Sequence, residues 1–67
     1  MKLKHANFAD LVYTNRKRWM ENQNEPEDAR WAALRALRGI AEDYAFQNMD
    51  SKTDRDEFRQ RAGLNGE

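Results

Sequence analysis

The residues best suited to acid–base or metal chemistry are one histidine and two pairs of adjacent acids. Imidazole and carboxylate groups act as general acids, bases or metal ligands when several converge on one water-poor site. Neighbours in sequence diverge by about 100° on a helix, so the two groups of each acid pair do not share a site. The histidine lies near the amino terminus, where we expect mobility. We therefore predict no catalytic residues, no cofactor site and no enzymatic activity. The groups are His5, Glu42 with Asp43, and Asp56 with Glu57.

The sequence predicts neither a disulfide nor a structural metal site. The sequence has no Cys and a single His, so it offers neither a disulfide nor a zinc-type ligand set. A chain of 67 residues hides only about 60% of the surface that its unfolded form exposes. Chains of this size without staples depend on unusually good helix packing or on a partner subunit. We therefore expect self-association as a homodimer.

The charge balance and the apolar content indicate a folded protein with no net charge. Twelve Lys and Arg balance twelve Asp and Glu, so the whole molecule does not attract a polyanion or an acidic membrane. Seven aromatic residues and a clear apolar periodicity favour folding despite a mean hydropathy of -1.19. No apolar run approaches the roughly 20 residues that cross a bilayer, and no secretory signal is evident. We expect a cytoplasmic protein without a membrane partner.

The positions of Gly and Pro divide the chain into three predicted helices, which make an all-α fold. The helices are expected over about residues 7–23, 25–49 and 54–62. A connection of a few residues between two long helices indicates an antiparallel helical hairpin, and the third helix is short. Residues 1–67 are predicted to form a single small helical domain.

Capping signals set these helix ends. The candidate N-caps share a short polar side chain that accepts a backbone hydrogen bond; they are Asn7, Asn24, and either Ser51 or Thr53. Pro26 suits the first turn of the second helix. Gly63 followed by Leu64 predicts a left-handed stop after the third helix, with Leu64 folding back toward Phe58.

Both long helices carry a stripe of apolar residues at helical spacing. Asn15 is a polar exception inside the first stripe, at heptad spacing from its neighbours. It either fixes the register of a helical assembly or reaches water at the edge of the stripe. The residues expected in the hairpin core or a dimer contact are Phe8, Val12 and Asn15, and Leu34, Leu37, Ile40 and Tyr44.

A second set of residues predicts a partner-binding surface. The alanines opposite the stripe of the second helix either let another backbone approach or simply favour the helix. Trp19 and Trp31 flank the predicted turn from either side, near several arginines. Trp and Arg are enriched at binding hot spots, but a Trp also serves as core with Arg stacked over its rim. The candidate partner-binding residues are Trp19, Trp31, Arg35, Arg38, Ala32 and Ala36.

Two main function classes follow. The first is a small non-enzymatic protein-interaction module that inhibits or modulates a cellular protein, of the kind that phages and mobile elements encode. The second is a small DNA-binding or transcription-modulating protein that uses an Arg-rich face of a dimer. We favour the first, because twelve acids offset the bases and no nucleic-acid-binding motif is present. A structural part of a larger assembly is a third possibility. The bases of the second class are Arg16, Lys17, Arg18, Arg30, Arg35 and Arg38.

Overall fold

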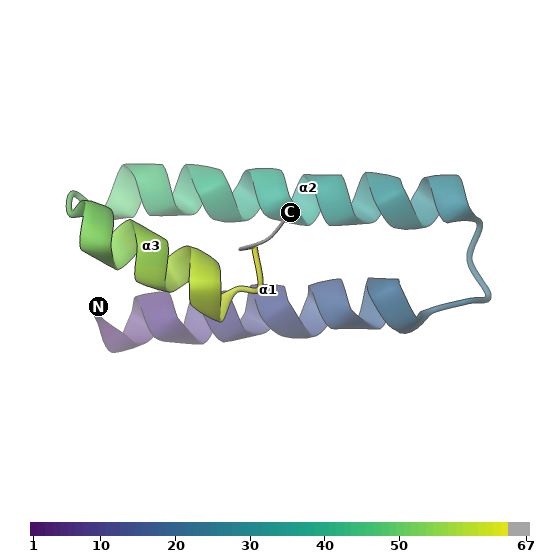
Figure 1. The fold of residues 1–67 in the computed structure, drawn as a ribbon, viewed down its shortest axis with the longest axis horizontal. Helices are drawn as coiled ribbons and strands as arrows, with labels where there is room; N and C mark the ends of the chain where they lie inside the picture. The colour runs from purple at the N-terminus through teal and green to yellow at the C-terminus, as the bar shows by residue number, and fades with distance from the viewer. Residues whose placement is uncertain (65–67) are drawn as a thin grey trace.

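A computed structural model describes residues 1–64 as three α-helices without a strand. The helices are α1 (Leu3–Glu21), α2 (Glu27–Asn48) and α3 (Lys52–Arg61). The long helices α1 and α2 run antiparallel, and α3 lies against both of them over the half that holds the amino terminus (Figure 1). The predicted all-α hairpin with a short third helix is therefore confirmed for the described part of the chain.

Two polar contacts fix the register of the hairpin. His5 Nδ1 and Tyr44 Oη lie 2.6 Å apart, and Arg30 Nε donates to the Trp19 carbonyl at 3.1 Å. The two contacts are fourteen residues apart along each helix, so one register holds for the length of the pair. The Arg30 side chain also donates to the Met20 carbonyl at 2.6 Å. It thereby satisfies two carbonyls at the end of α1 that have no partner within the helix.

The core is built mostly from small side chains. Four of its eight buried members are alanines, which let the three helices approach closely. Phe58 is the one large side chain that is fully buried among residues 1–64, and its ring stacks on those of Phe8 and Tyr44 at centroid distances of 6.2 and 5.6 Å. The short third helix therefore supplies the centre of the core. The eight residues are Ala9, Val12, Ala41, Ala45, Met49, Phe58, Ala62 and Leu64.

The predicted apolar stripe is only partly in this core. Val12 is buried, and Phe8 and Tyr44 pack against the core. Ile40 is 56% exposed, so it is not in the hairpin core of the single chain, and its alternative place in a dimer contact stays a prediction. Ile40 precedes Met49, a buried core residue, by nine residues, which turns it about 180° away on the helix. The other three members of the stripe, Asn15, Leu34 and Leu37, are half-buried.

The start of α1 differs from the prediction. The helix begins at Leu3 after an extended Lys2, so the prediction of Asn7 as N-cap is wrong. No side chain caps this end. His5 and Ala6 are buried, so the first turn is ordered by tertiary packing and not by a cap. The expectation of a mobile segment around His5 is wrong for the same reason.

The predicted N-cap is wrong for α2 and correct for α3. α2 begins at Glu27, and Pro26 occupies the cap position in place of the predicted Asn24. For α3, Ser51 proves to be the cap among the two candidates, because its Oγ accepts from the backbone N–H of Asp54 at 3.4 Å. α3 begins at Lys52, two residues before the predicted start.

The predicted left-handed stop after α3 is confirmed. Gly63 has φ +78°. Its N–H donates to the Gln60 carbonyl at 3.2 Å, and the N–H of Leu64 donates to the Arg59 carbonyl at 2.9 Å. These two bonds are those of a Schellman motif. Leu64 is buried in the same cluster as Phe58, so the stop also adds a residue to the core.

Gly63→Ala is expected to destabilise the protein by about 1–3 kcal/mol. A Cβ at this position would lie 2.9 Å from Tyr13 Cδ2, and the positive φ disfavours any side chain. Urea denaturation measures the loss. Gly39→Ala is the matched control, because nothing lies within 4 Å of its added Cβ; removing a glycine from the helix interior should stabilise by about 0.5–1 kcal/mol. Equal changes for the two variants would contradict the assigned stop.

Candidate functional site

The helix α3 fills half of the groove between α1 and α2. Arg61 Nε donates to Asp10 Oδ1 on α1 at 2.8 Å, and Arg59 Nη2 donates to Glu42 Oε2 on α2 at 2.7 Å. These two ion pairs hold α3 to both sides of the groove. Because α3 ends at Arg61, the described residues leave the other half of the groove, toward the α1–α2 turn, uncovered by a helix (Figure 1).

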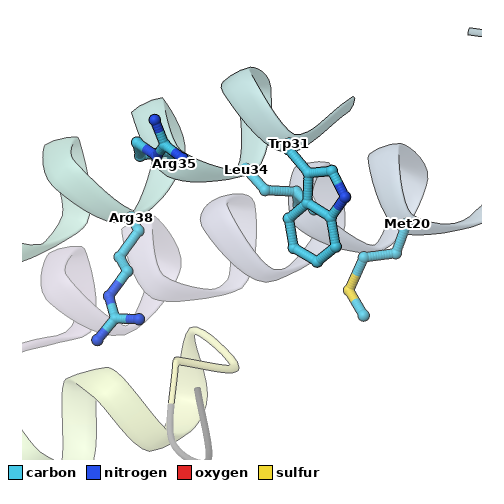
Figure 2. A pocket seen from close by; sticks show the side chains of 5 residues that line it. All are labelled: Met20, Trp31, Leu34, Arg35 and Arg38. Atoms are coloured by element: carbon cyan, nitrogen blue, oxygen red, sulfur yellow. The ribbon is translucent and has the colours of Figure 1, made fainter. Parts of the chain in front are cut away.

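The uncovered half contains a pocket of about 490 Å³. Trp31 and Met20 form an apolar surface there and are 59% and 56% exposed. Figure 2 shows the Trp31 indole from α2 beside the Met20 side chain from α1. Trp31 Nε1 donates to Glu27 Oε1 at 3.3 Å, which restrains one edge of the ring. We call this site the Trp31 groove; its lining residues are Met20, Trp31, Leu34, Arg35 and Arg38.

A buried arginine lies near the place where α3 ends. Arg16 is only 4% exposed, and its Nη2 donates to the Gly63 carbonyl at 3.4 Å. Burial and, to a smaller extent, the charge of Arg38 lower the pKa of Arg16. The second effect places the Arg38 and Arg16 guanidinium groups close together beside one end of the Trp31 groove.

The structure brings together only part of the predicted partner-binding set. Trp31, Arg35 and Arg38 all line the groove. Ala32 and Ala36 are exposed on α2 and do not line it. Their role as a contact surface stays a prediction.

Trp19 does not belong to the groove. It is half-buried, and among residues 1–64 no ring contact joins it to Trp31. Sequence reasoning did not assign Met20 to the partner-binding surface, and it assigned Leu34 to the core stripe. The available signal was the hairpin itself, because a turn of a few residues places Met20 near the start of the second helix.

A second apolar surface lies on the side of the hairpin away from α3. Tyr13 is on the α3 side, because it is the nearest neighbour of an added Gly63 Cβ. Leu11, two residues earlier, points about 160° away from Tyr13. Leu11 is 57% exposed and Ile40, which also points away from α3, is 56% exposed. We call Leu11, Ile40 and the half-buried Leu37 the back face.

The described residues offer no metal-type cluster. Within residues 1–64, no group of three His, Cys, Asp or Glu residues is placed to hold a metal ion. None of the helices described is long and apolar enough to cross a membrane. Comparison with protein-family models, curated proteins and solved structures found no match. The Trp31 groove and the back face are therefore the features that bear on function.

His5 has a structural role at the closed end of the hairpin. It is 5% exposed, and its ring packs edge-on against Tyr44 in addition to the Nδ1–Oη hydrogen bond. Burial is the main cause that lowers its pKa below 6.5. Lys4 and Lys2 lower the pKa further, and Asp54 opposes them. The neutral imidazole is therefore the form that the fold favours.

Acidification is expected to weaken the fold through His5. Because its pKa is lower in the folded chain than in the unfolded chain, the unfolded chain binds the proton first, and stability falls as the pH drops below about 6.5. Urea titrations at about pH 7.5, 6.5 and 5.5 measure this loss. His5→Asn should remove it, and an unchanged pH profile in that variant would contradict the assignment. Asp10, whose pKa is lowered chiefly by its hydrogen bond with Arg61, contributes only at more acidic pH.

Proposed function

We propose that this chain is a non-enzymatic, cytoplasmic protein-interaction module that binds another protein through the Trp31 groove. The observation that carries the proposal is an exposed Trp31 beside an exposed Met20, in the open half of a groove whose other half holds a helix. Trp, Met and Arg are enriched in the cores of protein interfaces. A partner surface that this chain covers cannot bind other molecules. We therefore propose that binding modulates or inhibits the partner.

Site-specific photo-crosslinking in cells that express the chain tests this proposal. A photoreactive amino acid replaces Arg35, which lines the groove, or Gln47, which is exposed on α2 outside it. The proposal expects a discrete protein adduct from position 35 that is absent from position 47. Trp31→Ala in the same chain should abolish the adduct. Identical adducts from both positions, or no adduct from position 35 and none when the photoreactive amino acid replaces Met20 instead, would contradict a binding role for the groove.

We also propose that two copies associate through the back face. Half of the buried core residues are alanines, which bury little apolar volume, whereas Leu11 and Ile40 remain exposed. Packing two back faces together would bury them as a four-helix arrangement.

Ile40→Lys is therefore expected to reduce the solution mass from that of a dimer to that of a monomer. Helix content should persist, because Ile40 is exposed in the single chain. Light scattering over a dilution series measures the mass. Leu3→Lys is the control, since Leu3 is 75% exposed near the start of α1, and its dimer should be unchanged. A monomeric wild-type chain, or equal effects of both variants, would rule out this interface.

DNA is the alternative partner. In the structure, two of the six basic residues considered for DNA binding are not available for phosphate contacts. Arg16 is buried, and Arg30 donates to two carbonyls at the end of α1. The exposed bases that remain offer few phosphate contacts. Binding to duplex DNA would weaken steeply as salt rises, whereas an apolar protein contact would respond little. A steep salt dependence at a specific duplex would favour this alternative.

A further inference from the structure

The groove is bordered on one side by α1 and on the other by α2, and we call these two edges its rims. The charged side chains on the rims differ between the filled half and the open half. On α2, Glu42 lies on the same stripe as Arg38 and Arg35, which precede it by four and seven residues. On α1, Asp10 lies on the same stripe as Lys17, seven residues later. On α2 the charge therefore changes from acidic to basic near the level at which α3 ends. On α1 the change is smaller, because the Nζ of Lys17 lies 4.0 Å from Glu21 Oε1 in an exposed pair.

The filled half shows how a helix is held in this groove. Each rim acid is paired with an arginine of α3, Asp10 with Arg61 and Glu42 with Arg59. Between these two pairs, Phe58 is fully buried against the floor. A helix thus docks here with apolar side chains inward and charges opposite to both rims. The same rule requires an occupant of the open half to carry acids.

The open half has the dimensions and the charge for such an occupant. Trp31 and Arg38 are seven residues apart on α2, which gives a length of about 10 Å, or two helical turns. Two of the five lining residues are arginines, Arg35 and Arg38, and none is acidic. Arg35 is exposed and makes no ion pair with another residue in the described part of the chain.

We propose that the Trp31 groove binds an acidic amphipathic helix of a partner protein, laid end to end with α3. The apolar side chains of this helix pack on Trp31 and Met20. Its carboxylates face Arg35 on one rim and, on the other, Lys17 at the edge of its exposed pair with Glu21. This inference rests on the proposed function and deepens it by naming the chemistry of the partner.

Selection from a random display library of peptides of about 16 residues, or four helical turns, tests the inference. The bait is the full chain, with the Trp31→Ala variant for counter-selection. The enriched peptides should carry a net negative charge and apolar residues at helical spacing. A synthetic copy should bind the wild type at least about tenfold more tightly than the Trp31→Ala variant, as measured by fluorescence anisotropy.

Charge reversal at two arginines separates local from general electrostatics. Arg35→Glu places an acid on the groove rim and should weaken the selected peptide by about tenfold or more. Arg18→Glu makes the same change in net charge on the exposed side of α1, about 160° from Met20. This control should change affinity by about twofold or less. Equal losses from the two variants would overturn the proposed rim contacts.

The remaining outcomes distinguish this inference from the function on which it rests. Enrichment of basic or uncharged peptides would overturn the acidic helix. A Trp31-dependent crosslink from position 35 would still support the interaction module in that case. Failure to enrich any Trp31-dependent peptide would also overturn the inference. A wild-type dimer that Trp31→Ala converts to a monomer would assign the groove to a second copy of the chain and overturn it as well.

Discussion

Phe58→Ala is expected to cause the largest loss of stability of any side-chain truncation in the core. Phe58 is fully buried beside the rings of Phe8 and Tyr44, which also contact each other, and truncating a buried Phe to Ala costs about 3–5 kcal/mol. At about 0.05–0.15 kcal/mol per residue, a chain of 67 residues has a total stability of about 3–10 kcal/mol. The loss is therefore about a third of the total stability or more, and it would unfold the chain if that stability is at the lower end of this range. Far-ultraviolet circular dichroism and urea titration measure it.

Phe46→Ala is the matched control for this variant. Phe46 is 72% exposed on α2, where its ring lies 5.1 Å from the Arg55 guanidinium carbon. Losing one exposed cation–π contact costs about 1 kcal/mol or less. If the two truncations destabilised the protein equally, Phe58 would not be the centre of the core.

The importance of Phe58 was not predictable from the pattern of the sequence. Within Lys52–Arg61 it is the one apolar side chain, and a single apolar residue has no periodicity to indicate which face is buried. The sequence indicated only that Leu64 could fold back toward Phe58. In contrast, the two long helices and their antiparallel pairing followed from repeated apolar spacing and from the turn before Pro26.

The start of α1 shows how tertiary contacts override a local signal. An Asn cap is worth about 1 kcal/mol, so Asn7 was a reasonable expectation. In the structure, residues before it are helical because His5 packs against Tyr44, 39 residues away along the chain. No local pattern in residues 1–7 contains this information.

The Trp31 groove was predictable on α2 but not across the hairpin. Trp31, Arg35 and Arg38 follow one another at intervals of four and three residues, which places them on one face of a helix. The contribution of Met20 depends on the register of α1 against α2. The extent of the groove depends on where α3 ends. Both are set by long-range contacts, so neither follows from spacing within one helix.

Ala41→Glu is expected to destabilise the protein by about 3 kcal/mol or more, because it forces a charge into a site with no exposed surface. Ala36→Glu is the matched control, with the same substitution on the same helix at an exposed position. It should change stability by no more than about 0.5 kcal/mol. Thermal and urea unfolding of both variants give the comparison.

The contrast between these variants depends on which alanines bring the helices together. Helix propensity favours Ala equally at both positions, so the sequence alone did not identify Ala41 as a point of close approach. The structure assigns that role to Ala41 because it is fully buried with Ala9 and Ala45 in the cluster that all three helices share. Equal tolerance of Glu at both positions would mean that the helices do not pack this closely. A folded but monomeric Ala36→Glu variant would instead move the proposed dimer contact from the back face to the alanines on the outer side of α2.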